Sequence, residues 1–247
     1  MTTLAFVSLQ SDGEREFAFY RNPGADQLYR TTEVDFSYIN NINIFHFGSI
    51  SLIEEPVKTT TLDLIKYAKK HNVITSYDPN LRPPLWNSLD QAKNVITNTL
   101  QYADILKLNE EEVKFLTGIN IANYGINEKK EKLKKLAKAG KYIYDLGPKL
   151  VIITLGNEGC YYFNGHNNNF LQGVKVKAID TTGAGDGFIA AVLSKINQKL
   201  KQHNNLKNIS EEEYNKLFMF ANKVGSIVTT KNGGIPSLPT LNEIKKY

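Results

Sequence analysis

The 247-residue sequence contains one cysteine, Cys160, and therefore cannot form a disulfide within the chain. A lone cysteine is typical of a reducing, cytoplasmic compartment. Cys160 stands between Gly159 and Tyr161 in an apolar stretch, which favours a buried structural thiol over a nucleophile. We therefore expect neither a disulfide nor cysteine chemistry in this protein.

The sequence also lacks long apolar runs and clustered histidines. Its apolar stretches are far shorter than the roughly 20 residues that a helix needs to cross a bilayer. The N-terminus has no charged segment of the kind that opens a secretory signal. His46, His71, His166 and His203 lie far apart, without the spacing of zinc ligands. These absences predict no membrane partner, no secretory signal and no zinc site.

The sequence has only a small excess of positive over negative charge. The 30 Lys and Arg residues against 25 Asp and Glu residues leave a net charge of +5, with the positive charges scattered. The densest basic run, 129–141, is typical of a solvated helix face. This balance suits an enzyme that handles anions and predicts no nucleic-acid partner. The hydrophobic fraction of 41% is enough for one sizeable core.

Short apolar segments alternate with segments of helical spacing along most of the chain. We expect strands at 42–47, 73–77, 104–108 and 150–155, and helices at 56–71, 90–102, 110–116 and 128–139. This alternation predicts a mostly parallel sheet with helices on its faces. Ligands bind such sheets at the carboxyl ends of the strands. The expected strands end at polar residues or at glycine, and this is the first indication of a ligand-binding site. These residues are Gly48, Asp78, Asn109 and Gly156.

Two segments have the pattern of a β-hairpin. Residues 4–9 and 16–20 flank an Asp12-Gly13 turn signal, and the Asn-rich stretch 164–169 is typical of a surface hairpin loop. There is no internal repeat and no low-complexity linker. We therefore expect a single domain.

The most informative stretch is the glycine-rich turn Gly183-Ala184-Gly185, followed by Asp186. An alternating pattern predicts a strand over 174–178, and the residues from 188 onward predict a helix. Backbone N–H groups at such a strand-to-helix turn favour an anion. The turn lacks the Gly-Lys-Ser/Thr of a Walker loop and is not a dinucleotide GxGxxG.

Two interpretations of Asp186 follow from its place at the helix start. It can act as the N-terminal cap of the helix. It can also act as a general base that accepts the proton of an attacking hydroxyl while the amides hold a phosphoryl group. Local spacing alone leaves both interpretations open.

The run Asp180-Thr181-Thr182-Gly183-Ala184-Gly185-Asp186 resembles the second signature of the ribokinase-like (PfkB) sugar kinase family. Three further segments agree in order and spacing: 109–112 with the N-x-x-E element, 154–159 with the T-L-G-x-x-G turn, and 229–237 with the C-terminal loop. The resemblance covers about residues 2 to 241. It implies a three-layer α/β fold with a mostly parallel central sheet. About residues 1–30 would form a small β lid, and 40–247 the nucleotide-binding core.

The resemblance also implies roles for these residues. Asp186 would be the catalytic base, and Gly183, Ala184 and Gly185 would form an anion hole. The residues implied at the ATP site are Thr154, Leu155, Gly156, Gly159, Gly185 and Asn222. Asn109 and Glu112 would act through water on Mg²⁺, which usually keeps several waters. A first-turn helix carboxylate remains the alternative interpretation of Glu112.

Two more sets of residues follow from the same resemblance. A monovalent cation, K⁺, would lie beside the anion hole, with many of its ligands being backbone carbonyls. The matching positions are Asp180, Thr182, Val228, Lys231, Gly233 and Ser237. Segments 19–26, 46–52 and 77–86 resemble those of bacterial fructokinases and imply the sugar-binding residues Arg21, Asp78, Asn80 and Arg82. An ion pair between Arg82 and Asp78 is the alternative interpretation of Arg82.

The family pattern normally begins before the position that matches Met1, with a first strand and a Gly-Gly-x-x-x-N segment. We therefore expect a chain that is truncated by about the first quarter of the family's length. The implied activity is transfer of the ATP γ-phosphoryl group to the 6-hydroxyl of fructose. A kinase of 2-keto-3-deoxygluconate or another sugar, and a non-catalytic nucleotide-binding remnant, are the alternatives. A homodimer formed through the lid is a further expectation.

Overall fold

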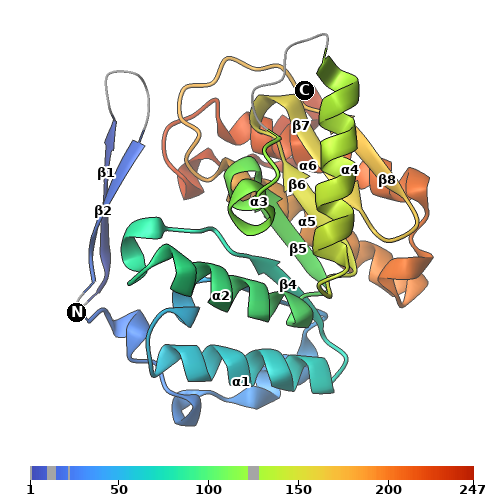
Figure 1. Ribbon diagram of the computed structural model, residues 1–247. Helices are drawn as coiled ribbons and strands as arrows, with labels where there is room; N and C mark the ends of the chain where they lie inside the picture. The colour runs from blue at the N-terminus through green and yellow to red at the C-terminus, as the bar shows by residue number, and fades with distance from the viewer. Residues whose placement is uncertain (1, 10–14, 22, 122–127) are drawn as a thin grey trace.

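The computed structural model describes residues 2–9, 15–21, 23–121 and 128–247. It consists of a main body with a central sheet and a two-stranded hairpin that stands apart from it (Figure 1). The sheet has six strands in the order β3-β4-β5-β6-β7-β8. They are β3 (Ile44–Gly48), β4 (Ile74–Asp78), β5 (Ile105–Asn109), β6 (Leu150–Thr154), β7 (Gly159–Phe163) and β8 (Asn168–Gln172).

Strands β3 to β6 pair in parallel, whereas β6, β7 and β8 pair antiparallel. The helices are α1 (Val57–Lys70), α2 (Leu89–Thr99), α3 (Glu110–Thr117), α4 (Lys129–Tyr144), α5 (Ala184–His203), α6 (Glu211–Val228) and α7 (Leu241–Lys246). The 3₁₀ turns are Ala25–Gln27, Thr31–Glu33, Phe36–Asn41, Ile50–Leu52, Pro83–Leu85, Leu100–Tyr102, Gly156–Glu158, Leu206–Asn208 and Ile235–Ser237. The predicted three-layer α/β fold with a mostly parallel sheet is confirmed.

Alternation along the strands divides the core into two layers. Leu106 and Leu108 of β5 pack with residues of α1 to α4, whereas Ile105 of the same strand packs with residues of α5, α6 and α7. Successive side chains of a strand point to opposite faces, so a strand covered on both sides reads as a continuous apolar run. The same rule places Lys107 and Asn109 on the face of the sheet that α5 covers.

The hairpin of β1 (Leu4–Leu9) and β2 (Arg15–Tyr20) forms its own antiparallel sheet, with Leu4 opposite Tyr20. It lies beside the body rather than within the main sheet (Figure 1). Phe6 is 61% exposed and Tyr20 is 59% exposed. Thr3 Oγ1 donates to Asp26 Oδ1 at 2.5 Å, which links the base of the hairpin to the following turn.

The expected strands and helices agree with the structure to within a few residues, apart from one strand. The segment 174–178 contains no strand. Val174 and Val176, which alternate in the sequence, line a cavity instead. A strand forms only where a neighbouring strand can pair with its backbone N–H and C=O groups, and this segment has no such neighbour among the described residues. The predicted hairpin loop at 164–169 is confirmed by the pairing of β7 with β8.

Cys160 is buried, as expected, on the α5 side of the sheet. Burial raises the pKa of its thiol to about 12, despite an opposing hydrogen bond with Asn222. The thiol therefore stays protonated and unreactive. No helix in the described part of the chain is long and apolar enough to cross a bilayer.

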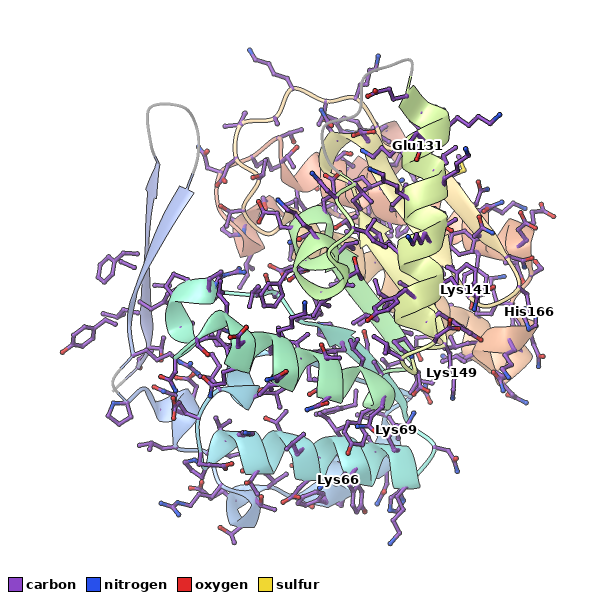
Figure 2. All side chains as sticks on the ribbon, viewed as in Figure 1. Lys66, Lys69, Glu131, Lys141, Lys149 and His166 are labelled. Atoms are coloured by element: carbon purple, nitrogen blue, oxygen red, sulfur yellow. The ribbon has the colours of Figure 1, made fainter. Side chains whose placement is uncertain are left out.

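A buried carboxylate, Asp104, links α1, β4 and the residue before β6 at the amino-terminal ends of the strands. Asp104 Oδ1 pairs with Lys69 Nζ at 2.9 Å and Lys149 Nζ at 2.7 Å, and Oδ2 accepts from Thr75 N at 2.9 Å. Lys69 and Lys149 are labelled in Figure 2. Burial by itself raises the pKa of Asp104, but hydrogen bonds from Lys149 and Thr75 outweigh it and lower the pKa below 3.8.

We expect Asp104→Asn to lower the free energy of unfolding by about 1.5–3 kcal/mol at neutral pH, because the buried carboxylate loses its charge-assisted hydrogen bonds with Lys69, Lys149 and Thr75. Since the folded pKa is depressed, the stabilisation by Asp104 is present above its unfolded pKa and is lost as the pH falls through the folded value. Urea unfolding at several acidic pH values should therefore show a shallower loss of stability in the variant.

The matched control is Asp145→Asn, which breaks an exposed pair with Lys141 on the surface of α4. Lys141 is labelled in Figure 2. An exposed pair contributes about 0–1 kcal/mol. Equal losses of stability in the two variants would contradict the structural role of Asp104.

Candidate active site

The carboxyl ends of β5 and β6 open into a cavity of about 1840 Å³, which the start of α5 also lines. Twelve of the residues singled out in the sequence lie on its wall. They are Asn80, Arg82, Asn109, Thr154, Gly156, Gly159, Thr182, Gly183, Ala184, Gly185, Asp186 and Asn222. Segments far apart in the sequence, from Asn80 to Asn222, therefore meet where parallel sheets bind ligands.

The turn that precedes α5 is shaped by Gly183. This residue is the N-cap of the helix, in the left-handed region with φ = 78°. A Cβ at Gly183 would lie 3.1 Å from the Gly234 Cα, so the backbones of two loops approach closely here. Glycine tolerates this conformation because it lacks a Cβ.

Asp186 is the third residue of α5 and is exposed on the cavity wall. The cap interpretation is therefore wrong, because Gly183 occupies the cap position. The first N–H groups of a helix have no partner within the helix. Those of Gly185 and Asp186 belong to this turn, so a carboxylate and the first N–H groups of α5 share one rigid element.

The Asp180 carboxylate joins the turn before α5 to the loop after α6. Oδ1 accepts from Thr182 N at 2.9 Å and Thr182 Oγ1 at 2.7 Å, and Oδ2 accepts from Gly233 N at 2.8 Å. The Thr229 carbonyl accepts from both Ile179 N and Asp180 N. Three residues of the predicted cation set, Asp180, Thr182 and Gly233, are thereby brought together.

The other members of that set take part in local contacts. Lys231 Nζ pairs with Glu243 Oε1 at 2.6 Å, so its side chain is directed to α7. The Val228 carbonyl accepts from Lys231 N, and Ser237 Oγ donates to the Gly234 carbonyl at 2.6 Å. Lys231 could thus contribute only through its backbone.

Asn109 and Glu112 form a capping box at the start of α3. Asn109 Oδ1 accepts from Glu112 N at 2.8 Å, and Glu112 Oε2 accepts from Asn109 N at 2.9 Å. Glu112 Oε1 accepts from Leu81 N at 2.8 Å. Burial and the nearby Asp78 raise the pKa of Glu112. The structure therefore shows Glu112 as a buried first-turn carboxylate, while Asn109 reaches the cavity.

The predicted sugar-binding residues are divided between two places. Asn80 and Arg82 line the large cavity, where Arg82 Nη1 donates to Asn80 Oδ1 at 2.6 Å. Asp78 is 3% exposed and pairs with Lys107 Nζ at 2.9 Å. The ion pair that the sequence suggested for Asp78 is thus made with a lysine of the neighbouring strand.

Arg21 lies away from the large cavity. Its Nε and Nη2 donate to Asp26 Oδ2 at 2.9 and 2.6 Å. It lines a separate hollow of about 450 Å³ together with Ile53 and Leu85. The structure therefore does not bring Arg21 together with Asn80 and Arg82.

At the other end of the cavity, Asn222 is buried under β8. Its Nδ2 donates to the carbonyls of Leu171 and Gln172 at 2.9 and 3.2 Å. Leu155 is 1% exposed and belongs to the core, so it supports the turn from behind.

Sequence reasoning missed several residues on the cavity wall. Lys132 Nζ pairs with Glu158 Oε1 at 2.5 Å and Glu110 Oε1 at 3.4 Å, and Lys129 Nζ lies 5.6 Å from the ring centroid of Phe170. Lys132 and Lys129 belong to the basic run that was interpreted as solvated. Lys107 could have been identified from the sequence, because a lysine inside an otherwise apolar strand needs an anionic partner.

Comparison with known proteins agrees with this geometry. The family described as pfkB family carbohydrate kinase matches residues 1–241. The chain is 43% identical over 241 residues to "Probable fructokinase-6, chloroplastic" of Arabidopsis thaliana, covering 97% of this chain and 58% of the relative. It is 42% identical over 243 residues to "Fructokinase-1" of Zea mays, covering 98% of this chain and 70% of the relative.

Solved structures show the same likeness. A fructokinase from Xylella fastidiosa with bound ATP superimposes with a TM-score of 0.81 at 25% identity, covering 99% of this chain and 72% of that one. A Vibrio cholerae O395 fructokinase with bound fructose, ADP and calcium superimposes with a TM-score of 0.76 at 26% identity, covering 98% and 72%.

The fold, the glycine-rich turn and the match over residues 1–241 together show that this chain belongs to the pfkB family of carbohydrate kinases. It spans 58% to 70% of the length of the two plant relatives described above.

We expect Gly183→Ala to destabilise the protein, because the new methyl group would press on Gly234 and displace the turn. The left-handed backbone itself costs an alanine about 1–2 kcal/mol. Gly118→Ala is the matched control, since Gly118 has φ = 74° and nothing within 4 Å of an added Cβ. The midpoint of thermal unfolding should fall in both variants and fall further in Gly183→Ala; equal decreases would contradict the close packing at Gly234.

Proposed function

We propose that this protein is an ATP-dependent fructokinase that converts fructose and ATP to fructose 6-phosphate and ADP. One observation carries the proposal: Asp186 and the Gly183-Ala184-Gly185 turn lie side by side on the wall of the cavity at the strand ends. The fructokinase names of relatives at 43% and 42% identity support fructose as the sugar.

In the proposed reaction, Asp186 accepts the proton of the sugar 6-hydroxyl as its oxygen attacks the γ-phosphorus. The new O–P bond forms as the bond from the γ-phosphorus to the β–γ bridging oxygen breaks, and ADP leaves with that electron pair. The N–H groups at the start of α5 hold the phosphoryl oxygens, assisted by the positive end of the helix dipole. Base and anion hole act in concert because one turn positions both.

The nucleotide would lie along the wall from this turn to Asn222. Thr154, Gly156 and Gly159 belong to the strand end and turn that we assign to ATP, and Asn222 lies at the adenine end. Gly159 lies on the cavity wall, and a Cβ there would lie 2.1 Å from the Leu171 carbonyl oxygen. The backbone of this turn is therefore packed closely against β8.

Mg²⁺ would neutralise charge on the ATP phosphates when bound. Asn109 reaches the cavity next to Glu110 and Glu111, and we assign the water-mediated contacts to this group. Glu112 does not fit as a direct ligand, since both of its oxygens accept backbone N–H groups.

For K⁺, the fit rests on two adjoining loops. Thr182 N and Gly233 N both donate to the Asp180 carboxylate, which holds these loops together. The ligands would be backbone carbonyl oxygens of the two loops, since such oxygens suit K⁺. We therefore propose a K⁺ site between the loops 180–182 and 228–237.

Fructose would bind at the Asn80 and Arg82 side of the cavity. The hairpin reaches the same cavity through Phe19, which supports its role as a lid. The exposed side chains of Leu4, Phe6 and Tyr20 support the pairing of two lids in a homodimer. The single buried cysteine supports a reducing, cytoplasmic location.

A substrate panel tests the choice of sugar. With ATP and Mg²⁺ present, we expect the protein to phosphorylate fructose more efficiently than ribose, glucose or 2-keto-3-deoxygluconate, measured as kcat/KM by a coupled ADP assay. A higher kcat/KM for the keto acid would end the fructokinase assignment while leaving the kinase class intact.

We expect Asp186→Asn to reduce kcat by about 10²–10⁴-fold, because the attacking hydroxyl loses its proton acceptor. ATP affinity should change little, since the backbone donors remain. Asp90→Asn is the matched control, because Asp90 is also an exposed first-turn carboxylate, on α2. Turnover near the wild-type value in Asp186→Asn would remove the base from the mechanism.

A further inference from the structure

The floor of the cavity holds a lysine to which no role has been assigned. Lys107 of β5 is 5% exposed, yet it lines the cavity. It points to the α5 face of the sheet, like Ile105 two residues before it. A buried lysine is costly unless its charge is satisfied, so its position requires an explanation.

Lys107 lies directly beside the glycine-rich turn. A Cβ placed on Gly185 would be 3.2 Å from Lys107 Nζ. The ammonium group therefore faces the start of α5, where the proposed function places the transferring phosphoryl group. Asp186 is close enough to affect its charge state, since it helps to raise the pKa of Lys107.

The anion partner of Lys107 comes from the neighbouring strand. Asp78 Oδ2 accepts from Lys107 Nζ at 2.9 Å, and both side chains are nearly inaccessible, at 5% and 7% exposure. Asp78 Oδ1 has no hydrogen-bond partner among the described residues. A buried ion pair with an unsatisfied oxygen contributes little to stability. This pairing is therefore better explained by function than by folding.

Lys107 also has donors left for a ligand. An ammonium group has three N–H donors, and within the described ranges Asp78 is the one partner that Lys107 contacts. Lys132, which lines the same cavity, already pairs with both Glu110 and Glu158. Lys107 is thus the lysine that lies beside Gly185 and has N–H donors left for an anion.

We propose that Lys107 is a further catalytic residue, whose ammonium group contacts the transferring phosphoryl group, and that Asp78 is the positioning residue that holds it beside Gly185. This inference rests on the proposed function, because it takes the phosphoryl position from that reaction. Negative charge on the phosphoryl oxygens shifts toward the leaving oxygen during transfer, and a fixed cation in a dry site stabilises it.

The test replaces Lys107 by methionine, which keeps the length and removes the charge. We expect Lys107→Met to lower kcat by about 10²–10³-fold, the loss typical of one preorganised donor. ATP affinity should fall roughly tenfold or more relative to ADP affinity, since a hydrogen bond to a charged group contributes about 1.5–3 kcal/mol. Lys69→Met is the matched control, because Lys69 pairs with buried Asp104 away from the cavity.

A double variant separates catalysis from folding. Lys107→Met alone leaves Asp78 buried without a partner, so its midpoint of thermal unfolding should fall. In Lys107→Met/Asp78→Asn the midpoint should recover, whereas turnover should remain low. Recovery of turnover together with the midpoint would overturn the proposal, as would near-wild-type turnover in Lys107→Met.

A split between kcat and KM tests the positioning role of Asp78. In Asp78→Asn the ammonium group of Lys107 loses the carboxylate that holds it beside Gly185. Because a small displacement of a catalytic group can cost about 10²-fold in rate, kcat should fall by up to that factor while the KM for the sugar changes little. An unchanged kcat would contradict the positioning role.

Nucleotide binding keeps the two proposals distinguishable. If the wild-type protein phosphorylates none of the sugars, the proposed function fails, and calorimetry with ATP and ADP then decides the role of Lys107. A selective loss of ATP affinity in Lys107→Met supports the contact, and an unchanged preference for ATP over ADP overturns it. Failure of the wild type to bind either nucleotide would overturn both proposals.

Discussion

The link between two loops through the Asp180 carboxylate is the contact on which the site depends. Asp180 holds Thr182 on its own loop and Gly233 on the loop that follows α6. Gly183 can then adopt its left-handed conformation against Gly234, and α5 starts at Ala184. This link helps to fix the direction of the first N–H groups of α5 and the position of Asp186 on the same turn.

A second constraint comes from the strand ends beneath that turn. On the face of the sheet that α5 covers, Ile105 precedes Lys107 on β5, and Ile74 and Ser76 precede Asp78 on β4. The carboxyl end of a parallel strand is the place where α5 ceases to cover this face and the cavity begins. The two opposite charges are tolerated there because they form an ion pair with each other. A buried charge pair thus marks the boundary between core and site.

Much of the fold could be predicted from the sequence because its signals are local. Buried strands such as β6 are short apolar runs. The start of α3 is indicated by Asn109 and Glu112, whose spacing is that of a capping box. The strand expected over 174–178 was wrong for the opposite reason. Alternation is a local pattern, but a strand exists only where a neighbour accepts its hydrogen bonds. No neighbouring strand is present beside that segment in the described ranges.

The candidate site was predictable to the extent that its residues are contiguous. The run from Asp180 to Asp186 specifies the turn, and Gly183 within it has the positive φ angle that favours glycine. Asp186 was placed at the helix start, but only the structure shows Gly183 as the cap. Arg21 and Asp78 were expected at the sugar, whereas Arg21 pairs with Asp26 and Asp78 with Lys107.

The sequence by itself determined the order of strands and helices, the two-faced core and the glycine-rich turn, because periodicity and backbone conformation depend on near neighbours. Only the tertiary structure decided which charged side chains meet. Asp78 and Lys107 are 29 residues apart, and Asp180 and Gly233 are 53 residues apart. Such pairs depend on which strands lie side by side and on how two loops pack. No local pattern encodes either of them.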